Sequence, residues 1–383
     1  MDDYTRQSLL VRSRKVARYV RLYGLFRTIA KVRAHYHMNN EYPETASLPV
    51  PAGPTGKHVG ILGCGKFAYA NVAYYVHQNF GAVIRGVMDT DLNRAISLAQ
   101  RYRADYYTTN ADDVLNDAHI DLIYIVSNHA SHAEYAIAAI RHGKAVHIEK
   151  PPVVNLDQLI RLCTAIDEHN GRVRLGFNRP ESPLVRLLKQ QLDAQTGPAM
   201  INWFVAGHAI SPDHWYFAEE EGGRILGNLC HWIDFTLRLI PAPSRYPVQI
   251  IPTRSRQSDC NISVSYVFGD GSIATITFSA KGHTFDGVRE TLNVHKGNLL
   301  AQLTDFRTLR FDIGPVVRHH RLWFRDHGHR RSILDSYLMR TDKSKQETGA
   351  MIRETGHLML KTREALETNT VMTVTAGFSR SLA

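Results

Sequence analysis

Cysteine is scarce in this chain of 383 residues. Its four cysteines, Cys64, Cys163, Cys230 and Cys260, form no C-x-x-C pair and have no spacing with histidine that is typical of a zinc site. We therefore expect neither a disulfide framework nor a bound metal ion, which is usual in a reducing cytoplasm.

Long apolar runs are absent as well. No stretch approaches the roughly 20 apolar residues that span a bilayer, and the N-terminus lacks the apolar core of a signal peptide. We expect a soluble, cytoplasmic protein that is not exported. With 44% apolar and 21% charged residues, the chain has enough material for buried cores. Its length predicts two domains with an appendage.

Positive charge is unevenly distributed. Residues 1–40 contain nine lysines and arginines against Asp2 and Asp3, so they carry +7 of the formal net charge of +10. Because the rest of the chain is nearly neutral, we expect no nucleic-acid partner for its body. The asymmetry indicates a special role for the N-terminal segment.

The same segment has helical periodicity. Val16, Val20 and Tyr23 recur at helical spacing between arginines, which predicts a basic amphipathic helix or helix pair over residues 8–35. Such a helix packs on the body or on a second copy of the chain. Alternatively, it docks on a partner protein or peripherally on the inner membrane surface. A proline-rich linker follows, so residues 1–56 form an extension and linker.

Strands and helices alternate from Lys57 onward, which predicts βαβ units and a parallel sheet. The expected strands are 58–62, 83–88, 122–126, 145–148 and 172–176, with helices at 66–79, 91–102, 131–142 and 156–169. The fold class is thus α/β, with a Rossmann domain over residues 57–180.

Residues 181–383 have a different pattern and predict an α+β domain with a large, mainly antiparallel sheet. The expected strands are 200–206, 248–253, 261–268, 272–280, 289–295 and 298–303, with a helix at 226–239.

A glycine turn joins the first expected strand to the first helix. Its sequence is Gly63-Cys64-Gly65-Lys66-Phe67-Ala68, a G-x-G-x-x-A pattern in the strand–turn–helix context that binds dinucleotides. The glycines permit a tight turn and close backbone approach, and the helix N-terminus favours a diphosphate. We therefore expect a dinucleotide cofactor here.

Asp89 ends the second expected strand. A carboxylate at this position accepts hydrogen bonds from the adenosine ribose and repels a 2′-phosphate, and no arginine follows it immediately. The pattern favours NAD over NADP. The alternative is that Asp89 caps the next helix, although Asp91 is better placed for that role.

Two further polar motifs follow strand ends. Ser127-Asn128-His129-Ala130-Ser131-His132 follows one strand, and Glu149-Lys150-Pro151 follows another. Ligands of open parallel sheets bind outside these carboxyl ends, so both motifs fall where cofactor and substrate meet. Lys150 could transfer a proton if its pKa is lowered, and otherwise it is a surface lysine.

In this order and spacing, these motifs resemble the Gfo/Idh/MocA family of oxidoreductases over residues 57 to about 310. The Glu149-Lys150-Pro151 tripeptide is the most specific match. The resemblance implies that Lys150 is catalytic and binds substrate, that Glu149 lies near the nicotinamide, and that the cofactor is NAD. Asn178-Arg179 resembles the family's pair at the domain junction, which contacts cofactor or substrate.

The resemblance extends to a stretch that begins with Gly222-Gly223. His231 matches the family's catalytic histidine, but the family's aspartate falls on Gly227 and its glutamate variant on Asn228, so the carboxylate is missing. Asn228 and His231 share a helix face, and Asn228 can hold a hydroxyl without accepting its proton. His214-Trp215, just before this stretch, could pack an aromatic ring on a sugar face.

These features predict an NAD-dependent oxidoreductase that transfers a hydride to or from a ring carbon of a sugar or sugar nucleotide. The resemblance is to members associated with polysaccharide biosynthesis and implies a homo-oligomer formed through the C-terminal sheet. Two alternatives remain open. One is an enzyme that retains NAD and uses transient oxidation for elimination or glycoside cleavage. The other is a catalytically weakened NAD-binding subunit of a membrane-associated assembly.

Overall fold

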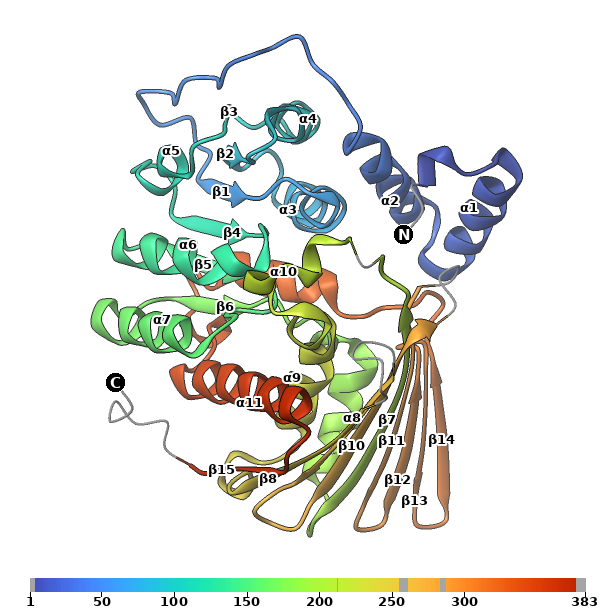
Figure 1. Cartoon of the computed structure of the whole chain (residues 1–383). Helices are drawn as coiled ribbons and strands as arrows, with labels where there is room; N and C mark the ends of the chain where they lie inside the picture. Colours follow the sequence, from blue (N-terminus) through green and yellow to red (C-terminus); the bar gives the residue numbers. More distant parts are fainter. Residues whose placement is uncertain (1–3, 212, 255–260, 283–286, 377–383) are drawn as a thin grey trace.

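A computed structural model describes residues 4–211, 213–254, 261–282 and 287–376 (Figure 1). Asp2, Asp3 and Cys260 lie outside these ranges. In the described residues no group of histidine, cysteine and acidic side chains could hold a metal ion. Over the same ranges, no helix is both long and apolar enough to cross a membrane.

The N-terminal domain is built on a six-stranded sheet of order β3-β2-β1-β4-β5-β6, in which every neighbouring pair is parallel. The strands are β1 (Val59–Leu62), β2 (Ile84–Met88), β3 (Tyr106–Thr108), β4 (Leu122–Ile125), β5 (Ala145–Ile148) and β6 (Val173–Leu175). Except for a half-buried residue in β3, their side chains are buried, because helices cover both faces. This is the expected Rossmann fold.

The helices of this domain are α3 (Ala73–Phe80), α4 (Leu92–Tyr102), α5 (Ala111–Leu115), α6 (His129–Arg141) and α7 (Leu156–His169), and a π-helical turn (Ala68–Val72) precedes α3. A helix from the end of the chain, α10 (His329–Leu338), packs beside α3 against the same sheet. Tyr124 of β4 donates a hydrogen bond to the carbonyl of Ile333 in α10 (2.9 Å). The second half of the chain therefore completes the first domain.

The C-terminal domain has a nine-stranded sheet of order β14-β13-β12-β11-β7-β10-β9-β8-β15. The strands are β7 (Ala199–His208), β8 (Val248–Arg254), β9 (Asn261–Val267), β10 (Ile273–Gly282), β11 (Arg289–Lys296), β12 (Leu299–Thr304), β13 (Thr308–Ile313), β14 (Val316–Arg321) and β15 (Met372–Val374). All pairs are antiparallel except β7 with β10. The sheet is thus mainly antiparallel, as expected.

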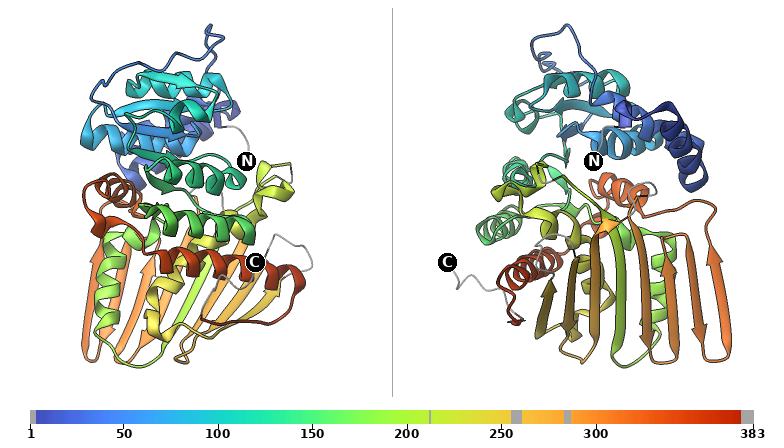
Figure 2. Two further views of the ribbon diagram at one scale, coloured as in Figure 1. Left: turned by 90° about the vertical axis from the view of Figure 1, so that its left-hand side faces the viewer. Right: turned by 45° about the vertical axis from the view of Figure 1, so that its right-hand side comes forward.

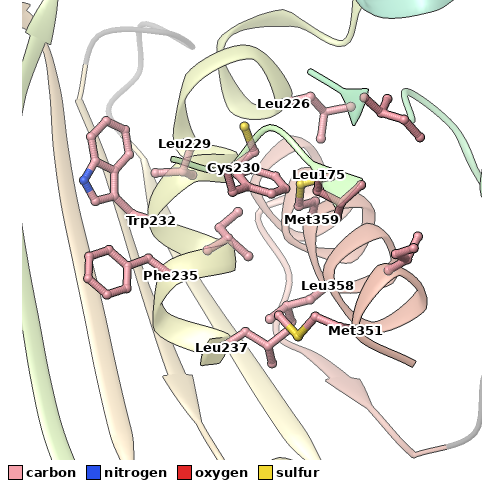
Figure 3. Close-up of a cluster of buried hydrophobic side chains, with 14 of the residues drawn as sticks. Leu175, Leu226, Leu229, Cys230, Trp232, Phe235, Leu237, Met351, Leu358 and Met359 are labelled. Atoms are coloured by element: carbon pink, nitrogen blue, oxygen red, sulfur yellow. The ribbon is translucent and has the colours of Figure 1, made fainter. Parts of the chain in front are cut away.

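Helices α8 (Pro183–Asp193), α9 (Cys230–Leu239) and α11 (Gly349–Thr368) cover one face of this sheet and leave the other face bare (Figure 2). Trp232 and Phe235 of α9 and Met351 and Met359 of α11 form part of a buried cluster (Figure 3). The cluster also contains Leu175 of β6, so one core joins the two domains and fixes their relative position.

The basic N-terminal segment forms two helices, α1 (Leu9–Tyr23) and α2 (Leu25–His37), that pack on both domains. His37 lies 2.6 Å from the carbonyl of Cys64 in the glycine turn. The carbonyl of Leu22 accepts a hydrogen bond from Arg325 in the C-terminal half (2.7 Å). The linker then passes the edge strand β3, where the Leu48 amide donates to Tyr107 (2.9 Å).

Candidate active site

The glycine turn follows β1. Gly63 has φ 91°, and a Cβ there would lie 2.5 Å from the carbonyl oxygen of Val126, so packing requires glycine. Gly65 differs, because a Cβ there would meet no atom within 4 Å. Close approach of a dinucleotide diphosphate accounts for glycine at this open position, so the turn fits the cofactor. The next residues are exposed Lys66, half-buried Phe67 and buried Ala68.

Asp89 is fixed by two backbone amides. Its carboxylate accepts hydrogen bonds from the amides of Cys64 (2.7 Å) and Asp91 (2.9 Å). Asp91 in turn caps α4 by accepting from the amide of Asn93, which confirms the capping expectation. Arg94 lies 4.0 Å from Asp89. A cation is therefore near the expected ribose site, although no arginine follows Asp89 directly in the sequence.

The segment after β4 contacts a carboxylate from the other domain. Asn128 donates to Glu221 (2.6 Å), and the Ala130 amide donates to the other carboxylate oxygen (3.2 Å). Glu221 is buried at the N-terminus of α6, where the helix dipole favours negative charge. The ring of His129 lies 2.9 Å from the Glu221 carbonyl. Sequence reasoning missed Glu221, which joins the domains at the cleft.

The histidines of this segment are interior groups. His132 has one ring nitrogen 2.8 Å from the Pro151 carbonyl and the other 3.2 Å from the Ser127 carbonyl, so it ties two strand ends together. Both ring nitrogens of His132 thus lie near backbone carbonyls, and its contact with the cofactor stays a prediction. Burial, followed by the charge of Lys150, lowers the pKa of His129 to about 2, which keeps its ring neutral. Ser127 bonds the hydroxyl of Ser131 (2.7 Å).

Lys150 extends from the end of β5 across the cleft. Its ammonium group donates to the carbonyl of Gly227 (2.8 Å). Burial lowers its pKa, but Tyr216, Cys230 and Glu149 outweigh burial, so the pKa is raised. The sequence analysis made proton transfer by Lys150 depend on a lowered pKa, and this condition is not met. Lys150 stays protonated and acts as a charged hydrogen-bond donor.

Glu149 is buried beneath this lysine. One of its oxygens lies 3.2 Å from the ring of His147, and its carboxylate lies so close to Gly176 that a Cβ there would come within 2.7 Å. The backbone amide of Lys150 also donates to Glu149 (3.3 Å). Glu149 therefore shapes the strand ends and supplies negative charge behind the ammonium group.

Gly227 occupies the position of the missing carboxylate. A Cβ there would lie 2.8 Å from His129 and 2.8 Å from the ring of Tyr216. An aspartate cannot fit unless these rings move. Tyr216 lies in the vacated space, with its ring centroid 5.9 Å from the Lys150 ammonium. Sequence reasoning missed Tyr216 and singled out its neighbour Trp215, whose ring packs on His129 (4.7 Å).

Asn228 and His231 lie at the start of α9, where a π-helical turn (Ile225–Leu229) precedes the regular helix. Oδ1 of Asn228 and Nδ1 of His231 are buried and have no hydrogen-bond partner among the described residues. Burial, and then the charges of Arg179 and Lys150, hold the pKa of His231 well below its usual range. The site thus offers two buried acceptors beside a charged donor, which suits hydroxyl groups.

Asn178 and Arg179 lie at the domain junction, as expected, and their contact with cofactor or substrate stays a prediction. Arg179 forms a two-point ion pair with buried Glu290 (2.8 and 3.0 Å), which also accepts from Trp232 (2.7 Å). Asn178 donates to the carbonyl of His327 (2.7 Å). Both side chains hold protein groups instead of facing the glycine turn. Through Trp232, the ion pair supports the neighbouring His231.

The fold and the site define the class: a two-domain Rossmann protein with polar side chains gathered at the carboxyl ends of the parallel strands. Residues 57–177 match the Gfo/Idh/MocA family, described as an oxidoreductase family with an NAD-binding Rossmann fold. This match covers the N-terminal domain, and that domain is an NAD-binding one.

Similar proteins include inositol 2-dehydrogenase of Ralstonia nicotianae, which is 26% identical over 209 residues, covering 54% of this chain and 60% of the relative. The chain thus matches less than two thirds of that relative's length. Two solved structures share the fold. Levoglucosan dehydrogenase with NADH and levoglucosan has TM-score 0.70 at 15% identity, covering 83% of this chain and 99% of that one. UDP-N-acetylglucosamine 3-dehydrogenase of Acidithiobacillus ferrooxidans has TM-score 0.66 at 17% identity, covering 82% and 98%.

Proposed function

We propose that this chain transfers a hydride between NAD(H) and a ring carbon of a sugar or sugar nucleotide. One observation carries the proposal: Lys150 donates to the carbonyl of Gly227, next to Asn228, and the buried Oδ1 of Asn228 and Nδ1 of His231 have no hydrogen-bond partner among the described residues. Such a set of donors and acceptors is complementary to vicinal hydroxyls. The names of the similar proteins, which include sugar, inositol and sugar-nucleotide dehydrogenases, support the substrate class.

Each residue has a proposed role. When bound, NAD supplies the hydride acceptor or donor. Lys150 donates a hydrogen bond to the reacting oxygen, and the ring of Tyr216 lies beside that ammonium group, with its centroid 5.9 Å away. In the oxidation direction, neutral His231 accepts the hydroxyl proton at its free Nδ1, and Asn228 orients a neighbouring hydroxyl. The resemblance and the geometry together suggest Gly63, Gly65, Lys66, Phe67, Ala68, Asp89, Ser127, Asn128 and Glu149 as the cofactor-side residues.

The bare face of the large sheet supports a homo-oligomer as part of this proposal. Met200 and Leu300 both pair with His295, so they stand in one row of the same face, where both side chains are exposed. An apolar row on a bare sheet suits a second copy of the chain. Light scattering of the wild type and a Met200→Glu/Leu300→Glu variant tests this. We expect the variant to have a lower mass.

Net NADH formation tests the proposed reaction. The protein is incubated with NAD and a panel of sugars, inositols and nucleotide sugars, and we expect one substrate class to produce NADH in proportion to oxidised product. His231→Ala should reduce turnover by ~10²-fold with NAD binding intact, the scale for losing an acid–base group. The exposed His169→Ala is the matched control.

Two outcomes would contradict the proposal. A product that forms without a net change in NAD would identify transient oxidation for elimination or glycoside cleavage. NAD binding without turnover of any substrate class would identify a catalytically weakened subunit, the alternative motivated by glycine at position 227.

A further inference from the structure

Helix α2 of the N-terminal extension packs against the cofactor side of the Rossmann domain. It contacts the π-helical turn that precedes α3, and it also contacts α4 (Figure 1). The family match begins at residue 57, so this helix lies outside the matched part of the chain. Its hydrogen bonds nevertheless reach the glycine turn, which raises the question of what the extension does there.

His37, the last residue of α2, holds the glycine turn. Its side chain is buried, and Nε2 lies 2.6 Å from the carbonyl oxygen of Cys64. Because a carbonyl oxygen can only accept, Nε2 carries the hydrogen and donates it. The amide of Cys64 donates to the carboxylate of Asp89 (2.7 Å). Both backbone groups of Cys64, the residue before Gly65, are thus fixed by side chains.

The ring of His37 contributes this one hydrogen bond and a stacking contact. Burial lowers its pKa, and the bond to the Cys64 carbonyl offsets burial only in part, so the ring is neutral. Nδ1 is buried and has no hydrogen-bond partner among the described residues. The ring stacks on Tyr69, with centroids 4.2 Å apart. Since an apolar side chain could also stack there, the donor to Cys64 is the part of the contact that requires histidine.

Arg27, near the start of α2, holds the helix that follows the glycine turn. Its guanidinium group donates to the carbonyl of Ala70 and to Oδ1 of Asn71 (2.7 Å). Both acceptors belong to the π-helical turn (Ala68–Val72), where the regular α-helical hydrogen bonds are interrupted. Arg27 therefore stabilises the irregular start of the helix whose N-terminus faces the diphosphate in a Rossmann domain.

The chain beyond α2 fastens the element that follows Asp89. The amide of Tyr42 donates to Oδ1 of Asn93 (2.9 Å), and the side chain of Asn40 donates to the hydroxyl of Ser97 (3.2 Å). Both acceptors lie in α4. The extension thus contacts the glycine turn, the start of the next helix and α4, which surround the diphosphate and the adenosine ribose in a Rossmann domain.

We propose that the N-terminal extension is a positioning element of the NAD site, in which His37 and Arg27 hold the glycine turn and the following helix ready for the adenosine half of the cofactor. Preorganisation of this kind raises affinity, because a turn that is already ordered loses less conformational entropy on binding. The inference rests on NAD binding and not on the proposed reaction, so it is tested without a sugar substrate.

Calorimetry of the full-length protein with NAD tests the proposal. His37→Leu keeps an apolar side chain but removes the donor, so the Kd for NAD should rise about fivefold, the scale of one lost hydrogen bond. His37→Gln retains an N–H donor and should restore most of the affinity. Arg27→Met should raise the Kd about threefold. ADP-ribose, which lacks the nicotinamide, should lose affinity by the same factors.

Hydrogen exchange of the free protein reports the order of the turn itself. The amides of Gly65 and Lys66 should exchange faster in His37→Leu than in the wild type, and saturating NAD should remove most of the difference. A general loss of stability would instead speed exchange throughout the domain. Equal exchange of these amides in both proteins would contradict the positioning role.

Two matched controls change side chains at the far end of α3. His77→Leu removes a histidine whose ring packs on Tyr102 (centroids 5.7 Å apart). Arg330→Met removes an arginine that donates to Asn79 (2.7 Å), as Arg27 does to Asn71 at the near end. Both controls should bind NAD like the wild type.

Three results would overturn the proposal. In the first, His37→Leu and Arg27→Met bind NAD as well as the controls. In the second, the controls lose as much affinity as these variants, so the effect is not specific to the glycine turn. In the third, His37→Gln is no better than His37→Leu, so the donor is irrelevant. If His37→Leu does not fold, the comparison of Arg27→Met with Arg330→Met decides.

Discussion

The two sides of the cleft differ in how closely they follow the family pattern. On the cofactor side, Gly63, Gly65 and Asp89 each occupy the position that their role requires. On the substrate side, neither Gly227 nor Asn228, the two positions at which the resemblance expects a carboxylate, has one, and a Cβ at Gly227 would lie 2.8 Å from the ring of Tyr216. The difference teaches that binding of NAD and proton transfer are separable. The same cofactor site can be combined with a substrate side whose hydrogen-bond donors and acceptors differ from those that the family resemblance implies.

The largest effect should come from Lys150, where the two sides meet. Lys150→Met removes the charged donor but keeps an unbranched side chain, so we expect turnover to fall by ~10²-fold or more while NAD affinity changes little. The exposed Lys189→Met is the control. Near-normal turnover of Lys150→Met would show that the substrate side works through other groups.

The ion pair behind α9 should dominate the pH dependence of stability. Burial raises the pKa of Glu290, but Arg179 and His327 outweigh it and lower the pKa from 4.5 to about 2. A depressed carboxyl pKa contributes stability above the unfolded pKa, which is lost as the pH falls from about 4.5 to about 2. Glu290→Gln should therefore cost about 3 kcal/mol at neutral pH.

Urea unfolding at several pH values measures this effect. The gap in free energy of unfolding between wild type and Glu290→Gln should shrink as the pH falls through that window. Asp157→Asn, in an exposed ion pair, should leave stability nearly unchanged. A gap of constant size would mean that charge pairing at Glu290 contributes no stability.

Restoring the family carboxylate should harm the protein. Gly227→Asp places a Cβ against His129 and Tyr216, so we expect a loss of about 1–3 kcal/mol of stability and reduced turnover. Adding Tyr216→Ala should recover part of the stability, since it removes one of the clashing rings. Thermal unfolding of both variants measures this. A fully stable and more active Gly227→Asp would show that the glycine does not define the substrate side.

The smallest effect concerns the choice of cofactor. Asp89→Asn removes the negative charge but keeps an oxygen that can accept from the Cys64 amide, so the turn should persist. We expect the wild type to bind NAD(H) more tightly than NADP(H). In the variant, the ratio of the two affinities should fall by about tenfold. Arg94→Gln should weaken the binding of NADP(H) more than the binding of NAD(H). If calorimetry finds that the wild type binds NAD(H) and NADP(H) equally well, Asp89 does not discriminate between the two cofactors.

Local patterns predicted the strand–turn–helix that holds the glycine turn. The glycine turn and Asp89 are close in the sequence, and their strand–turn–helix context fixes their geometry. The main strands of both sheets were predicted for the same reason. Several elements were missed. Among them, β3 has three residues, and α10 buries Ser332, Asp335 and Ser336, so it lacks an apolar stripe. The helices α8 and α11 were not predicted either. The edge hairpin β13–β14 ends in a strand whose side chains are largely exposed, and it was missed too.

The substrate side could not be predicted because its partners are distant in the sequence. Glu221 meets Asn128, and Gly227 meets Lys150, only after the domains close on one core. The raised pKa of Lys150 involves Tyr216 and Cys230, which are distant in the sequence, so the sequence indicated the residue but left its pKa open. Motifs thus locate a site, whereas its electrostatics depend on tertiary contacts.

A crystal structure with NADH and the oxidised substrate tests the central claim most directly. We predict the cofactor diphosphate against Gly65 and the adenosine ribose on Asp89. The carbonyl oxygen of the substrate should lie within hydrogen-bonding distance of the Lys150 ammonium, with Asn228 and His231 on neighbouring hydroxyls. A substrate bound with its reacting oxygen away from Lys150, or a nicotinamide outside this cleft, would contradict the account.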